Sequence, residues 1–297
     1  MQTVAVVQAG TVLGNPDATL SKLKRYALEC KQRGAALAVF PEAFIGGYPR
    51  GTLFGTTLGI RTDAGRKIFQ EYANGAIEVP GKVTEALGEI ARENSLYMII
   101  GAIERDGGTL YCTAVYLGPD GRLLGKHRKL MPTAFERVIW GNGDGSTLSV
   151  IESPIGRFGA LICWENYMPL ARVAMYEQRI ELYCTPTVDD RDSWIPTVRH
   201  IAREGRCYVL SSCQLLTRDA YPQHWLSPGE SLADLPIRGG SCIVDPLGNV
   251  IAGPLYGDEG IVTGEVDVSR LMEVKYDLDV VGHYARPDVF QFEVRKP

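Results

Sequence analysis

Three side chains of complementary chemistry each follow a short apolar or β-branched run. They are Glu42, Lys129 and Cys163. In open α/β sheets ligands bind beyond the carboxyl ends of the strands, so we expect these three side chains to converge on one pocket. A carboxylate, an ammonium group and a thiol together are the set needed to attack an unsaturated carbon–nitrogen bond.

Each of the three groups has a separate expected task. The Cys163 thiolate supplies the nucleophile, and we expect a nearby cation or the start of a helix to keep its pKa low. Glu42 takes the thiol proton, passes it to the substrate nitrogen and later activates water. Lys129 and backbone N–H groups stabilise the charge of the tetrahedral intermediate.

Taken singly, these residues also have ordinary interpretations. A glutamate after a strand often caps a helix, a lysine in a basic run is usually solvated, and a cysteine at a strand end is usually part of the core. A dyad of Cys163 with a distant histidine also stays open, although the four histidines show no HExxH spacing. The chain has no GxSxG elbow and no phosphate-binding loop, and residues 141–145 lack the spacing of a dinucleotide fingerprint.

Composition excludes several classes of protein. The 297 residues are 45% apolar and 22% charged, which is typical of a soluble globular chain. A formal charge of −4 without a run of five basic residues argues against nucleic acid or a membrane surface as partner. The apolar stretches are too short to span a bilayer and no signal peptide is apparent, so a cytoplasmic location is expected. Seven cysteines without CxxC spacing predict neither disulfides nor a metal site, and no cofactor is expected.

Strand-like and helix-like segments alternate along the chain. The alternation predicts an α/β fold in one domain, residues 1–297, with hairpins inserted at 110–126 and 241–252. Strands are expected at 3–8, 37–40, 97–103, 157–163, 181–184 and 207–212, and helices at 20–30, 83–91, 170–179 and 194–204. Residues 51–76 and 218–240 are expected to be irregular loops that hold substrate.

Five motifs resemble those of the nitrilase superfamily, and more narrowly its nitrilase branch, which converts nitriles to carboxylic acids and ammonia. They lie at residues 40–51, 126–133, 136–146, 159–166 and 281–288, so the resemblance covers essentially the whole chain. It implies an α-β-β-α sandwich and a homodimer or higher homo-oligomer. The chain ends at Pro297 without the longer tail of many family members, so we expect dimers rather than long filaments.

The resemblance also assigns roles. It implies Glu42 as general base, Lys129 as transition-state stabiliser, Cys163 as nucleophile, and Glu136 as a second acidic residue beside them. Backbone groups of Trp164 and Lys129 are the implied oxyanion donors.

The substrate class rests on the same resemblance. Tryptophan after the nucleophile favours a nitrilase over an amidase or N-carbamoyl hydrolase, which use the same three groups and remain the alternative. The third interpretation is that the protein is a non-enzymatic interaction module. We expect a medium-sized apolar pocket for an arylaliphatic or aromatic nitrile, although Trp194 fits equally well as a core residue. The residues implied to flank it are Tyr48, Trp164, Thr187, Val188 and Trp194.

Overall fold

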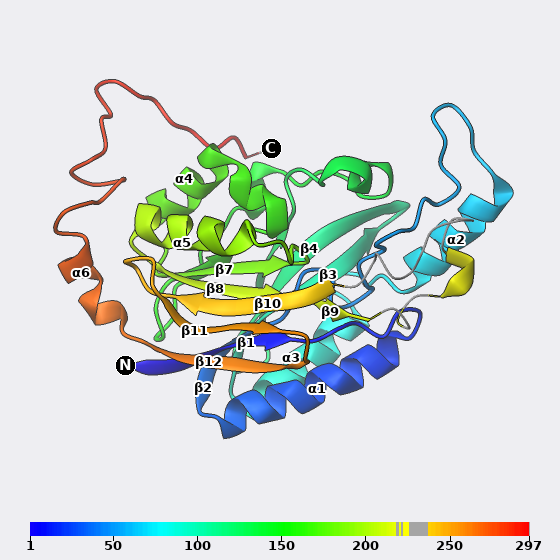
Figure 1. Cartoon of the computed structure of the whole chain (residues 1–297), viewed down its shortest axis with the longest axis horizontal. Helices are drawn as coiled ribbons and strands as arrows, with labels where there is room; N and C mark the ends of the chain where they lie inside the picture. The colour runs from blue at the N-terminus through cyan, green and yellow to red at the C-terminus, as the bar shows by residue number, and fades with distance from the viewer. Residues whose placement is uncertain (218–219, 221, 226–236, 297) are drawn as a thin grey trace.

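Two β-sheets packed face to face form the middle of the molecule, and a layer of helices covers each outer face (Figure 1). This arrangement comes from a computed structural model, which describes residues 1–217, 220, 222–225 and 237–296. The expected α-β-β-α sandwich is confirmed. No helix in these residues is both long and apolar enough to cross a membrane.

The first sheet is mixed, with its three central strands β1, β2 and β3 parallel and the remaining pairs antiparallel. Its order is β12 (Gly260–Val266), β1 (Gln2–Gln8), β2 (Ala35–Val39), β3 (Tyr97–Asp106), β4 (Thr109–Leu117) and β5 (Leu123–Arg128). The second sheet is parallel from β6 to β8 and antiparallel beyond. Its order is β11 (Val250–Tyr256), β10 (Ile237–Val244), β8 (Tyr208–Cys213), β7 (Leu182–Thr187) and β6 (Phe158–Ala160), and β9 (Leu215–Leu216) pairs with β10.

Helices cover the outer faces and one end of the sheets. The α-helices are α1 (Pro16–Gln32), α2 (Asp63–Asn74), α3 (Lys82–Asn94), α4 (Pro169–Glu177), α5 (Trp194–Gly205) and α6 (Leu271–Val274). Short 3-10 helices are η1 (Ala134–Val138), η2 (Gly145–Thr147), η3 (Cys163–Tyr167), η5 (Gln223–Trp225) and η7 (Val268–Arg270). In Figure 1, α1 and α3 lie under the first sheet and α4 and α5 lie over the second.

The two-residue period of the strands sorts side chains between the layers. In β1, Val4 and Val6 belong to the core between the sheets, while Ala5 and Val7 pack against α1 and α3. In the second sheet, Leu182 faces the same central core, and Tyr183 packs under α4 and α5. A strand that is buried on both faces has a nearly continuous apolar sequence, which is why these strands could be predicted from the sequence.

Two elements differ from the sequence expectation. Residues 51–76 are not irregular throughout, because α2 forms there, with the Thr62 hydroxyl accepting from the Gly65 N–H and Tyr72 buried. Strand β6 ends at Ala160, three residues before its expected end. Of the expected loop 218–240, residues 218–219, 221 and 226–236 lie outside the described part, and 237–240 belong to β10.

One buried carboxylate, that of Glu165, joins the two sheets beside Lys129 and Cys163. Glu165 of η3 accepts the Leu130 N–H at 2.7 Å and the Ile162 N–H at 2.8 Å. His127 of β5 places its Nε2 2.9 Å from each oxygen of the same carboxylate. Leu130 follows Lys129 and Ile162 precedes Cys163, so Glu165 fixes the backbone beside both residues.

Removing this brace should destabilise the protein strongly. We expect Glu165→Ala to lower the free energy of unfolding by about 3–5 kcal/mol, because His127 and two N–H groups lose a buried partner. Urea unfolding measures the change. Glu152→Ala, at an exposed carboxylate, is the matched control and should stay within about 0.5 kcal/mol of wild type. Equal losses in the two variants would contradict the bracing role.

Candidate active site

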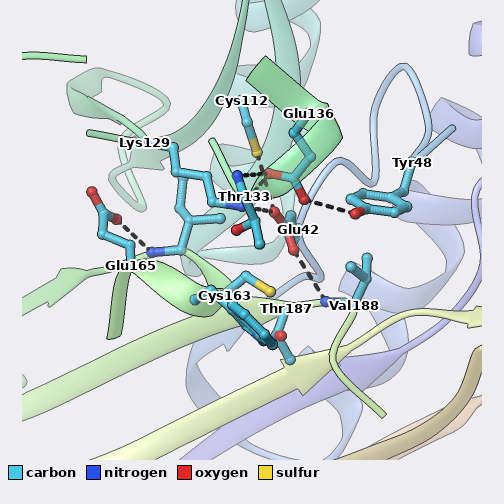
Figure 2. A network of polar contacts seen from close by, with 12 residues as sticks. Glu42, Tyr48, Cys112, Lys129, Thr133, Glu136, Cys163, Glu165, Thr187 and Val188 are labelled. Carbon is cyan, nitrogen blue, oxygen red and sulfur yellow. Dashed lines mark hydrogen bonds and ion pairs between the residues drawn. The ribbon is translucent and has the colours of Figure 1, made fainter. Parts of the chain in front are cut away.

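Glu42, Lys129 and Cys163 meet in a buried cluster between the sheets (Figure 2). Glu42 follows β2, Lys129 follows β5, and Cys163 begins η3 beyond β6. Lys129 Nζ donates to Glu42 Oε1 at 2.8 Å, and the Cys163 thiol lies close enough to the Glu42 carboxylate to lower its pKa. The sequence expectation that these three side chains converge is therefore met in geometry.

The backbone at these positions is strained. Cys163 has φ of 51°, and Ala43, next to Glu42, also has φ of 51°. Ala134, in the helical turn that carries Glu136, has φ of 48°. Non-glycine residues in this left-handed region cost of order 1–3 kcal/mol each and persist only where the surroundings impose them. Three such residues in or next to the cluster indicate that the fold positions the side chains of Glu42, Glu136 and Cys163 at a cost in stability.

Three groups donate hydrogen bonds to the Glu42 carboxylate. Besides Lys129, the Val188 N–H donates to Oε2 at 3.1 Å and the Cys112 thiol donates to Oε1 at 3.6 Å. Burial raises the pKa of the Glu42 carboxyl, Lys129 opposes that shift and Glu136 reinforces it, and the balance stays above the ordinary value. Glu42 is therefore a stronger base than a solvated glutamate.

Lys129 is buried with its ammonium between two carboxylates. Its Nζ donates to Glu136 Oε2 at 2.9 Å as well as to Glu42. Burial by itself lowers the pKa of Lys129, but Glu42, Cys163 and Glu136 together hold that pKa well above its usual range. The ammonium group therefore stays charged, and the ordinary interpretation of Lys129 as a solvated lysine is wrong.

The Cys163 thiol differs from the sequence expectation. Burial raises its pKa, the Glu42 and Glu136 charges add to that shift, and Lys129 only partly offsets it. The pKa of the Cys163 thiol is therefore raised, whereas the sequence led us to expect a lowered one. A nucleophilic thiolate requires a local proton acceptor, and the Glu42 carboxylate is near enough to shift the pKa of the thiol.

Glu136 completes the polar cluster, as the resemblance implied. Its carboxylate accepts the Tyr48 hydroxyl at 2.7 Å and the Thr133 N–H at 2.6 Å (Figure 2). Burial and the Glu136 charge raise the pKa of Tyr48 well above its usual range, so the phenol stays a donor. Tyr48 and Thr133 thereby fix Glu136 against Lys129.

A cavity of about 260 Å³ opens onto Cys163. Its wall includes Trp164, whose Nε1 donates to Asp189 at 2.7 Å, and Arg191, whose guanidinium lies 4.5 Å from the Trp164 ring centroid. Arg191 and Asp189 also form an ion pair, and Arg50 reaches Asp190 at 3.5 Å. The wall beside the thiol therefore combines paired charged side chains with Tyr48, Trp164 and Val188, where the sequence predicted an apolar pocket.

The expected substrate-binding residues divide into three groups. Tyr48, Trp164 and Val188 line the cavity with Cys163. Thr187 is buried behind it, where its hydroxyl accepts the Asp189 N–H at 2.9 Å. Trp194 is not brought to the cavity: it packs in the core under α5, with its Nε1 donating to Ser211 Oγ at 2.9 Å. The alternative interpretation of Trp194 as a core residue is the one that fits.

Backbone donors near the thiol also differ from expectation. The Lys129 N–H already donates to the Cys112 carbonyl at 2.8 Å, so it is committed to the sheet. The Trp164 N–H lies in the first turn of η3, where N–H groups have no acceptor within the helix. Trp164 therefore fits the oxyanion role better than the Lys129 backbone does.

The sequence did not single out several residues of the site. Cys112 and Asp189 carry no motif of their own, and Arg50 lies in a motif without an assigned role. His127 pairs with Glu165, and in the described part of the chain no hydrogen bond joins a histidine to Cys163. The described part of the chain also contains no group of three or more His, Cys, Asp or Glu side chains that could hold a metal ion.

Several known proteins match this chain in sequence over almost its whole length. An aliphatic nitrilase of Sinorhizobium fredii is 57% identical over 98% of this chain and 94% of its own length. Nitrilase 2 of Arabidopsis thaliana is 49% identical over 98% of this chain and 88% of its own. An arylacetonitrilase of Trametes versicolor is 48% identical over 99% of this chain and 96% of its own length.

A solved structure agrees at the level of the fold. The NitFhit protein of C. elegans superposes with a TM-score of 0.76 at 18% identity, over 99% of this chain and 67% of that one. Residues 3–276 match the carbon-nitrogen hydrolase family. The chain therefore belongs to the carbon-nitrogen hydrolase family, within its nitrilase branch.

Proposed function

We propose that this protein is a nitrilase that hydrolyses a nitrile to a carboxylic acid and ammonia, with Cys163 as nucleophile, Glu42 as general base and Lys129 as electrostatic stabiliser. The observation that carries the roles is the position of Glu42 beside both the Cys163 thiol and the Lys129 ammonium group. Curated nitrilases at 48–57% identity over nearly the whole chain support the reaction class.

The first half of the reaction forms a thioimidate. Glu42 removes the thiol proton, the sulfur attacks the nitrile carbon, and the carbon–nitrogen triple bond becomes a double bond. The proton passes from Glu42 to the nitrogen, so the cluster regains its starting charge. Lys129 stabilises the negative charge that builds on the nitrogen during attack.

The second half consumes two water molecules. Glu42 takes a proton from the first water, whose oxygen adds to the thioimidate carbon, and returns that proton to the nitrogen. Transfer of the hydroxyl proton to the same nitrogen then expels ammonia and leaves a thioester. A second water, again deprotonated by Glu42, breaks the carbon–sulfur bond and releases the acid. Loss of the thiol instead of ammonia from the first tetrahedral intermediate releases an amide.

Glu136 acts by holding Lys129 opposite Glu42. It accepts from the ammonium group, from Tyr48 and from Thr133, so it fixes the position of the cation to which the reacting nitrogen is drawn. We further propose that Tyr48, Trp164 and Val188 contact substrate, that residues 1–297 act as one domain, and that the protein forms a homo-oligomer in the cytoplasm.

Product analysis on a substrate panel tests the reaction class. We expect ammonia and acid from arylacetonitriles or aliphatic nitriles, little turnover of the matching amides or an N-carbamoyl amino acid, and no product from Cys163→Ala. Cys184→Ala, at a buried cysteine outside the cluster, is the matched control and should stay active. Turnover confined to amides or carbamoyl compounds would assign the protein to the amidase alternative.

The pH dependence of kcat/KM tests the base. Glu42 must be ionised to accept the thiol proton, and its pKa is raised, so activity should fall as pH decreases through a value above the ordinary glutamate range. In Glu136→Gln the carboxylate that helps raise this pKa is lost, so the acid limb should move to lower pH. The same variant should lose turnover by about 100-fold while keeping its fold.

The matched control for the pH profile is Glu152→Gln, which removes an exposed carboxylate. It should leave both the acid limb of the profile and the turnover rate unchanged. An unshifted limb in Glu136→Gln with near-normal turnover would remove Glu136 from the mechanism.

Alkylation distinguishes an enzyme from an interaction module. Cys163 lines a cavity, whereas the other six cysteines are buried at 0–1% exposure. We therefore expect iodoacetamide at pH 7 to label Cys163 first, and more slowly in Glu42→Gln, where the proton acceptor is lost. Peptide mass spectrometry over a time course measures both rates. Labelling of Cys163 no faster than of the other six would favour the module.

A further inference from the structure

A second cavity adjoins the one at Cys163. Its volume is about 380 Å³, and it shares Tyr48, Arg50 and Glu136 with the cavity that opens onto the thiol. We call it the side cavity. Its lining comes from the chain before α2 and from η1: residues 48–54, 56, 58, 135, 136, 138 and 139. Figure 1 shows the segment before α2 standing out from the end of the sheets.

The two cavities differ in chemistry. Around Cys163 the wall carries Arg50, Asp190, Asp189 and Arg191, two cations and two anions that pair with one another. The side cavity is walled mainly by apolar side chains: Leu53, Phe54, Phe135, Val138 and Ile139. A small polar group suits the first cavity and a hydrocarbon group suits the second.

Apolar side chains at the side cavity are left facing solvent. Phe135 is 82% exposed and Val138 54%, although large apolar groups ordinarily gain free energy from burial. Phe54 is fixed from behind by Phe69 and Tyr72, so the deep wall is packed while the rim is open. Such a surface next to a reactive thiol favours an apolar ligand group that covers the rim.

We propose that the side cavity binds the hydrocarbon group of an arylaliphatic nitrile whose nitrile carbon is at Cys163, with Leu53, Phe135 and Val138 as specificity-determining residues. This rests on the proposed nitrilase function. Tyr48 and Glu136, which are hydrogen bonded to each other, line both cavities, so a ring in the side cavity reaches a nitrile carbon at Cys163 only through a spacer such as one or more saturated carbons.

Size agrees with a ring. A cavity of about 150 Å³ lined by apolar side chains is enough to bind benzene. The side cavity is more than twice that volume, so it holds a phenyl group with its saturated linker, or a fused two-ring group. An acetonitrile-sized substrate would leave the side cavity empty and gain nothing from its lining.

Filling the cavity tests the proposal. Val138→Trp should lower kcat/KM for phenylacetonitrile and 3-phenylpropionitrile by about 10-fold or more, and change that for propionitrile by less than about twofold. Val289→Trp makes the same substitution at a valine of similar exposure, 56%, outside both cavity walls, and should leave the ratio of the two rates unchanged.

A second variant guards against misfolding of the first. Leu53→Ala removes apolar contacts without adding bulk, and should raise KM for the aryl nitriles while leaving propionitrile unaffected. Circular dichroism and thermal unfolding verify the fold of each variant, and light scattering reports the oligomeric state.

The outcomes separate the two proposals. An aryl-to-propionitrile ratio in Val138→Trp and Leu53→Ala equal to that of Val289→Trp would overturn the subsite while nitrile hydrolysis stands. A change in oligomeric state with an unchanged ratio would also overturn it and assign the surface to a second copy of the chain. Absence of nitrile turnover in the wild-type protein would overturn the proposed function, and the subsite with it.

Discussion

The site depends on one buried cation between two carboxylates. Lys129 is excluded from solvent, and an isolated charge there would be very costly, so both Glu42 and Glu136 must lie within hydrogen-bond distance of its ammonium group. Those carboxylates are in turn buried and need donors of their own. The Val188 N–H, the Thr133 N–H and the Tyr48 hydroxyl supply them. Each element that reaches the cluster therefore contributes a compensating group, and the thiol is placed within this network.

Such a network requires the two sheets to be fixed against each other. Glu42 and Lys129 extend from the first sheet, whereas Cys163 and Val188 extend from the second. A relative shift of one sheet by an ångström would break hydrogen bonds to buried charges. The Glu165 carboxylate, which binds backbone N–H groups beside Lys129 and beside Cys163, holds the spacing from behind. The apolar core between the sheets supplies most of the cohesion, and this polar brace sets the register at one end.

The sequence predicted the parts of this arrangement that obey short-range rules. Two-residue periodicity and buried apolar runs located most strands, and residue type after the strands pointed to Glu42, Lys129 and Cys163. It could not predict α2, where Gly65 and the preceding glycines obscured the pattern of Ile68, Phe69 and Tyr72. Asp189 and Cys112 were also missed, because their roles depend on contacts between segments far apart in sequence. Trp194 shows the reverse error: its helix follows the strand end that lines the cavity, but its side chain turns into the core.

The raised pKa of the Cys163 thiol is compatible with nucleophilic attack because of where its proton goes. Ionisation to solvent would add a negative charge to a buried cluster, and that is the cost which burial imposes. Transfer to Glu42 instead moves the charge by a few ångströms and leaves the net charge of the cluster unchanged. Burial raises the pKa of the acceptor as well as that of the donor, so the two shifts partly cancel in the transfer. Lys129 lies against the carboxylate before the transfer and attracts the thiolate after it. The reactivity of the thiol therefore depends on the difference in proton affinity between two neighbouring groups, which the fold controls through their distances to one ammonium ion.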